Sequence, residues 1–196
     1  MSGAPTSGAE GADLAALLAA GWSEADLAWE RLQEEAAEKN QGGDRDAAAA
    51  LWAEALRLAR ANFTGNDPRL AASLANQALA RRQSGNAGTA TALLEEALLI
   101  WDASGPWVEA LEPERRARSS TFHLRLEAKH PGGYARHSRE RTRALAAEGR
   151  AALLALREGK PPPFDGLARW RREKPEGFTG GRKLMAAVLL LAGEPG

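Results

Sequence analysis

Apolar residues recur every three or four positions through much of this chain, which is the spacing of amphipathic helices. The clearest stripes run from Leu70 to Leu79 and from Ala90 to Trp101. The polar residues Ser84-Gly85-Asn86 lie between the stripes and have the chemistry of a turn. The pattern therefore predicts two antiparallel helices, each with an apolar face that must pack against a neighbour.

Helix start signals agree with this periodicity at three places. Asp67 is a plausible N-cap, and Pro68 after it suits the first turn of a helix. Ser23 and Asp26 have capping-box spacing, and Asp44 can cap a helix that follows it. The sequence therefore predicts helices that begin near residues 24, 45 and 68.

The two segments around Gly43 and Gly85 align without gaps at a constant offset of 42 residues. Small residues align with small ones, as Ala36 does with Ala78, and large ones with large ones, as Trp52 does with Leu94. A fixed period of this length is typical of a helical repeat array.

The aligned residues resemble the tetratricopeptide repeat, in the longer 42-residue variant of kinesin light chains. They are Leu74, Ala78, Gly85, Ala90, Leu94 and Ala97 in the second copy, and Leu32, Ala36, Gly43, Ala48, Trp52 and Ala55 in the first. The chain departs from the family at Gln77 and Glu35, where a large apolar residue is usual, and at Arg81 and Lys39, where an aromatic is usual. The resemblance implies an all-α, right-handed superhelix of antiparallel helix pairs that grips peptides on its concave side.

We expect three regions along the chain. Residues 1–12 are small and polar and are expected to be disordered. Residues 13–159 are expected to form the repeat domain, with a short helix at 13–20, two clear repeats at about 24–104 and a degenerate third at about 107–158, built from helices at 112–129 and 134–158. Residues 160–196 combine a proline-rich break, a basic-aromatic segment and an apolar helix at 184–192.

That apolar helix has two interpretations. In the first, Leu184, Val188 and Leu191 pack on the last helix pair and cover the exposed end of the array. In the second, the helix detaches and docks elsewhere.

Composition supports a helical protein, because Ala, Leu, Arg and Glu are abundant and β-branched residues are scarce. The absence of cysteine excludes disulfides, thiolate metal sites and cysteine nucleophiles. The longest apolar run is too short to cross a bilayer, and no secretory signal is visible. We expect a cytoplasmic protein without a membrane partner; the preference for Arg over Lys suggests a bacterial source.

The net charge of zero conceals two opposite halves. Residues 1–100 carry 8 Lys and Arg against 14 Asp and Glu, while residues 101–196 carry 18 against 12. The halves either attract one another or present two faces to different partners.

Nothing in the sequence indicates an enzyme, a metal site or a cofactor. His123, His130 and His137 are spaced by seven, but Pro131 breaks any common helix between them. Gly159-Lys160 is followed by proline and is no phosphate-binding loop. The adjacent acids Glu34-Glu35 and Glu95-Glu96 are interpreted as solvated helix faces.

The main functional hypothesis is a non-enzymatic adaptor or assembly factor that binds a partner protein or peptide. The resemblance assigns the ligand-contacting position to Asn76. The candidate partner-binding residues are Gln33, Glu34, Asn40, Asn76, Arg82 and Gln83, each of which could instead be an ordinary solvent-exposed side chain. The alternative is a nucleic-acid-binding regulator that uses a basic surface in the C-terminal half. That surface would contain Arg136, Arg139, Arg143, Arg171 and Arg172. No nucleic-acid motif accompanies it, so we rank it second.

Overall fold

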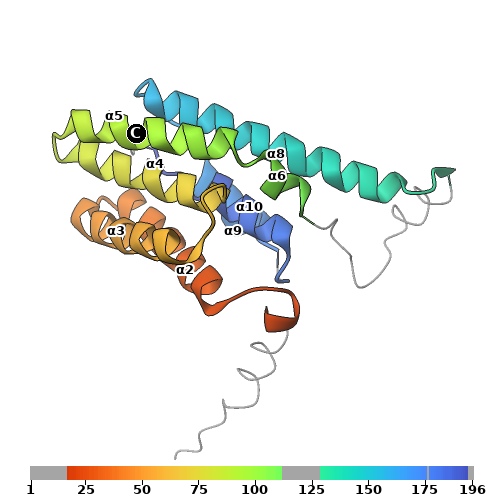
Figure 1. Cartoon of the computed structure of the whole chain (residues 1–196). Coiled ribbons are helices and arrows are strands. Elements are labelled where there is room, and N and C mark those ends of the chain that lie inside the picture. The colour runs from red at the N-terminus through yellow and green to blue at the C-terminus, as the bar shows by residue number, and fades with distance from the viewer. Residues whose placement is uncertain (1–16, 112–128, 176, 194–196) are drawn as a thin grey trace, which may run out of the picture.

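The computed structural model describes residues 17–111, 129–175 and 177–193, and these ranges contain helices and no strand. Figure 1 shows the arrangement, and the helix labels here follow it. The helices are α2 (Glu24–Gln41), α3 (Arg45–Asn62), α4 (Pro68–Gln83), α5 (Ala87–Asp102), α6 (Gly105–Glu109), α8 (Gly133–Arg157), α9 (Gly166–Glu173) and α10 (Gly180–Leu189). The predicted all-α class is confirmed. The segment expected to be disordered, most of the short helix at 13–20 and nearly all of the helix expected at 112–129 lie outside the described residues.

The predicted helix starts at α2, α3 and α4 are confirmed by their caps. Ser23 Oγ accepts a hydrogen bond from the Asp26 backbone N–H at 3.2 Å, and the Asp26 carboxylate accepts one from the Ser23 backbone at 2.6 Å. The side chains of Asp44 and Asp67 each accept a backbone N–H in the first turn of their helices. These bonds satisfy donors that have no partner inside the helix.

The turns that join α2 to α3 and α4 to α5 are equivalent. Each contains one glycine in the left-handed region, Gly43 with φ 85° and Gly85 with φ 82°. A side chain is strained in this conformation, so glycine at both positions allows the same tight turn in each helix pair. The 42-residue offset therefore corresponds to a structural repetition.

Helices α2 to α5 form a stack in which each helix packs against the next along the chain. Figure 1 shows α5, α4 and α3 side by side, with α8 running alongside α5 in the opposite direction. The small residues Ala78 and Ala90 are fully buried between α4 and α5, as expected for positions where two helices approach closely.

Helix α8 confirms the helix expected at 134–158, and it joins the stack through Trp101 of α5. The indole N–H of Trp101 donates to the Ala146 carbonyl at 3.0 Å. Trp101 also lies against Gly149, where a Cβ atom would collide with its ring. Glycine at this position lets the two helices approach closely.

The last helix differs from the sequence prediction of an apolar helix at 184–192. It begins earlier, because the Thr179 side chain accepts the Arg182 backbone N–H at 3.2 Å and caps it. It ends at Leu189, and residues 190–193 continue in a non-helical conformation because α4 binds their backbone, as described below. The predicted helix was therefore misplaced at both ends.

Helix α10 belongs to the main hydrophobic core. Leu184, Val188 and Leu189 are fully buried and share one cluster with Leu74 of α4 and Leu153 of α8. The predicted packing on the last helix pair is observed for its described member, α8. The same helix also packs on α2, α4 and α9, so it fills the middle of the molecule rather than covering one end.

Candidate functional site

A row of buried polar side chains runs along the contact between α2 and α4, where sequence analysis placed the partner-binding residues. The Trp29 indole N–H donates to Ser73 Oγ at 2.7 Å, and Gln33 Nε2 donates to the same oxygen at 3.2 Å. Further along, Gln83 Nε2 donates to Asn40 Oδ1 at 3.1 Å. The paired residues are 40 to 44 residues apart, close to the 42-residue period, so the row follows the repeat from one end of the helices to the other.

Asn76 lies in the middle of this row and is fully buried, and both of its amide hydrogens and its oxygen make hydrogen bonds. Its Nδ2 donates to Gln33 Oε1 at 2.8 Å and to the Leu190 carbonyl at 2.8 Å. Its Oδ1 accepts the Ala192 backbone N–H at 2.9 Å. One carboxamide thus binds a carbonyl and an N–H two residues apart in the non-helical C-terminal segment; we call this arrangement the Asn76 clamp. The position that the resemblance assigned to a ligand is occupied by the chain's own C-terminal segment.

Four acidic residues of α2 form a second row, at intervals of four residues. Each pairs with a cation of the C-terminal region. Glu30 accepts from Arg182 at 2.9 Å, Glu34 from Lys174 at 2.7 Å and Glu38 from Arg171 at 2.7 Å, and Asp26 accepts from Lys183 at 3.1 Å. We call these four residues the acidic stripe. They confirm that the two halves of the chain attract one another, at least along α2.

The buried end of the acidic stripe is a charge cluster. The Arg69 guanidinium bonds both Asp26 and Asp67, and all three residues are almost inaccessible to solvent. Burial raises the pKa of Asp26, but the hydrogen bond and charge of Arg69 outweigh it, so this pKa lies below the usual aspartate range. Burial lowers the pKa of Arg69, and the two carboxylates raise it above its usual value. Both side chains are therefore ionised in the folded protein.

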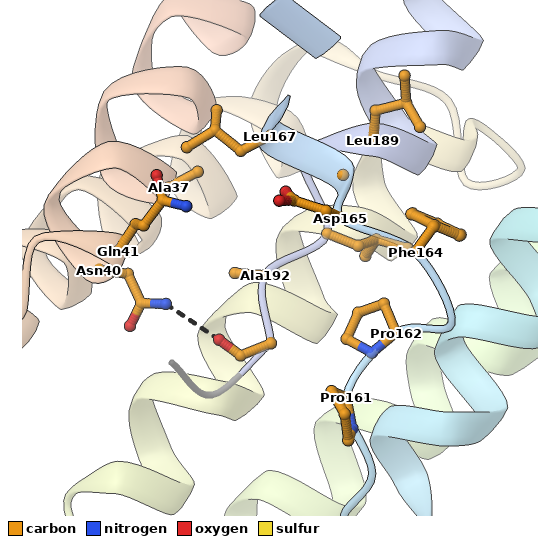
Figure 2. A pocket seen from close by; sticks show the side chains of 13 residues that line it. Ala37, Asn40, Gln41, Pro161, Pro162, Phe164, Asp165, Leu167, Leu189 and Ala192 are labelled. Carbon is orange, nitrogen blue, oxygen red and sulfur yellow. Dashed lines mark hydrogen bonds between the residues drawn. The ribbon is translucent and has the colours of Figure 1, made fainter. Parts of the chain in front are cut away.

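A cavity of about 240 Å³ opens where the polar row ends. Figure 2 shows Asn40 and Gln41 of α2 on one side, Pro161 and Pro162 on the other, and the C-terminal segment at Ala192 between them. Asn40 Nδ2 donates to the Gly193 carbonyl at 3.1 Å across this space. The cavity thus continues the path of the segment that Asn76 holds.

No family model, no curated protein and no solved structure matches this chain. Within residues 17–111, 129–175 and 177–193, no group of three His, Cys, Asp or Glu side chains is placed to hold a metal ion. Among the helices described, none is both long and apolar enough to cross a membrane. In the structure, α2 and α4 bind the backbone of the chain's own non-helical residues 190–193.

The structure brings together most of the predicted partner-binding residues. Gln33, Asn40 and Asn76 are buried, so the alternative that they are ordinary solvent-exposed residues is wrong. Arg82 is half-buried and is not part of the row. Its side chain donates to the Leu156 carbonyl of α8 at 2.8 Å. Glu34 is half-buried and paired with Lys174, which corrects its interpretation as a solvated helix face. Whether any of these residues contacts a partner remains a prediction.

The predicted basic surface is divided between helices. Arg136, Arg139 and Arg143 lie on the first half of α8, where Arg143 bonds Glu109 at 2.7 Å. Arg171 and Arg172 lie on α9 and pair with Glu38 and Glu173. Three of the five arginines therefore already have a carboxylate partner.

Sequence analysis did not identify several residues that complete the site and that lie far apart in the sequence. Ser73, Arg69 and Glu30 were not singled out, and Arg182 and Lys183 were assigned to a basic-aromatic tail. The four-residue spacing of the acidic stripe was a signal that could have been noticed, because it places four carboxylates along one side of α2.

Proposed function

We propose that this chain is a non-enzymatic adaptor or assembly factor, organised like a tetratricopeptide repeat array, that binds an extended segment of a partner protein along α2 and α4. The observation that carries the proposal is the Asn76 clamp. A single buried carboxamide pairs with a carbonyl and an N–H two residues apart, which recognises backbone rather than side chains. Recognition of this kind accepts different sequences in one extended conformation.

The partner competes with residues 190–193 and leaves α10 in place. Leu190 and Leu191 are buried, and exposing both costs about 3 to 6 kcal/mol. Releasing α10 as well exposes several more buried apolar side chains and raises the cost to the order of 10 kcal/mol. Since that approaches the whole stability of a typical domain, we propose exchange of the short segment alone.

The partner segment offsets the free energy lost by exposing Leu190 and Leu191 if it makes the same hydrogen bonds and apolar contacts. It needs small or apolar side chains where Leu190 to Ala192 now lie, and it continues into the cavity beside Pro161 and Pro162. The alternative function, nucleic-acid binding by the C-terminal half, has weaker support, because Arg143, Arg171 and Arg172 are already paired with carboxylates.

Site-specific photo-crosslinking in the source cell tests the proposal. Benzoylphenylalanine is placed in the full chain at Gln41, which is exposed and lines the cavity, or at Arg139 of the basic surface, and a Leu99 substitution on exposed α5 is the control. We expect discrete protein adducts from position 41 and none from position 99. Nucleic-acid adducts from position 139, with no protein adduct from position 41, would establish the alternative instead.

A further inference from the structure

A second groove is lined by residues of α3, α4 and α5. It has a volume of about 380 Å³. Leu56 of α3 and Leu93 of α5 give it an apolar lining, and Arg57, Arg60 and Arg81 also line it. We call it the α3–α5 groove.

Gln77 of α4 lines this groove and is the first sign that it binds something. Its side chain is only 6% exposed, and its Oε1 is buried without a hydrogen-bond donor. A buried carbonyl oxygen without a partner destabilises the folded state, and an apolar residue of similar size would avoid that loss. A polar group that is unfavourable for folding is typical of a functional position.

The three arginines are the second sign. Arg57 lies 3.9 Å from Glu54 and Arg60 lies 3.6 Å from Glu96, and all four side chains are about half exposed or more. Exposed pairs at these distances contribute little and are readily exchanged for other anions. Arg81 is exposed and makes no ion pair within the described part of the chain. The groove therefore offers positive charge at its edge and apolar surface within.

We propose that the α3–α5 groove binds an acidic segment of a partner protein through a tryptophan or tyrosine anchor. An aromatic ring fills the apolar space beside Leu56 and Leu93, and its indole N–H or phenol O–H supplies the donor that the Gln77 carboxamide lacks. Flanking carboxylates of the segment pair with Arg57, Arg60 and Arg81. This site lies on other surfaces than the Asn76 clamp and does not depend on the function proposed above.

Selection from a phage-displayed library of random dodecapeptides on the full-length protein tests which peptide chemistry the groove prefers, because the library contains no designed sequence. We expect enriched peptides that carry Trp or Tyr flanked by Asp or Glu. The affinity of one selected synthetic peptide is then measured by fluorescence anisotropy. A selection that enriches no peptide, or enriches peptides without acidic residues, overturns the proposal.

Two variants locate the binding. The double charge reversal Arg57→Glu with Arg81→Glu is expected to lower the affinity for the peptide by about tenfold or more, because it replaces attraction of the peptide carboxylates by repulsion. The matched control, Arg31→Glu with Arg45→Glu, changes the net charge equally at exposed positions outside the groove and should leave the affinity unchanged. Equal loss in both variants would show that the peptide responds only to overall charge.

Gln77→Leu separates a binding role from a structural one. It removes the unpaired oxygen, so its melting temperature should equal or exceed that of the wild type, while the peptide affinity falls by about tenfold. A variant that gains stability and binds as tightly as the wild type overturns the role of Gln77.

Discussion

Asn76 shows how one side chain can fix the path of a distant segment. Its two hydrogens and its oxygen are all used, and they bind α2 and the C-terminal segment at the same time. Because the carboxamide has no exposure to solvent, water cannot replace a bond that is lost. The residue therefore stabilises the fold itself.

Asn76→Ala should destabilise the protein by about 2 to 4 kcal/mol, because it leaves the Leu190 carbonyl, the Ala192 N–H and Gln33 unpaired in the interior. From the sequence alone, the better helix propensity of Ala predicts that the fold survives or gains slightly; the observed burial reverses that expectation. Urea titration measures the difference. Asn62→Ala, at an exposed asparagine, is the control, and equal stability of the two variants would contradict the role of Asn76.

Asp26 should make the protein sensitive to acid. Its pKa in the folded state is below that of the unfolded chain, so its stabilising contribution is present above about pH 4 and is lost as the pH falls further. The free energy of unfolding of the wild type should therefore fall more between pH 6 and pH 3 than that of Asp26→Asn. If both proteins lose the same amount, the Arg69–Asp26 pair does not stabilise the fold.

At the scale of the elements, contacts between helices depend on a few positions, where either a side chain larger than glycine would collide or two opposite charges pair. Gly149 brings α8 against Trp101, and the acidic stripe attaches α2 to the C-terminal region. Exposed pairs such as Arg171–Glu38 contribute little, whereas Glu30 and Arg182 are buried and hold their helices in one register. Removal of Glu30 takes away the carboxylate partner of the buried Arg182 guanidinium.

Gly149→Ala should destabilise the protein by about 1 to 3 kcal/mol, although Ala is the better helix former, because the new methyl group collides with the Trp101 ring. Gly88→Ala is the matched control. Gly88 is also helical, and a Cβ there meets no atom within 4 Å, so that variant should gain up to about 1 kcal/mol. Thermal melting measures both, and a stabilised Gly149→Ala would contradict the close approach of α5 and α8.

At the scale of the whole molecule, the C-terminal region is part of the core. A chain that ends at Pro163 should associate and bind the dye ANS, because it exposes the apolar side chains that α10 covers and leaves the Asn76 clamp empty. A chain that ends at Gly193 keeps every described contact and should behave like the wild type. Size-exclusion chromatography compares them, and a monomeric, stable shorter chain would revive the detachable docking helix.

A feature of the fold could be predicted from the sequence when the residues that determine it are close together in the sequence. The starts of α2, α3 and α4 could be predicted, because Ser23, Asp44 and Asp67 act on backbone within their own first turn. The position of α10 could not, because its determinants are far away in sequence: Arg182 pairs with a residue 152 positions earlier. The apolar pattern at 184–192 gave no indication that Leu190 would leave the helix, since the cause lies on α4.

The Asn76 clamp also sets an order of events during synthesis. Leu190 follows Asn76 by 114 residues, so a ribosome adding about 5 to 20 residues per second delivers it on the order of 10 s later. Throughout that interval Asn76 has already been synthesised, but Leu190 and Ala192, which it binds in the folded chain, have not. Any extended segment already present in the cell, including one from a folding helper, has its best opportunity to bind then.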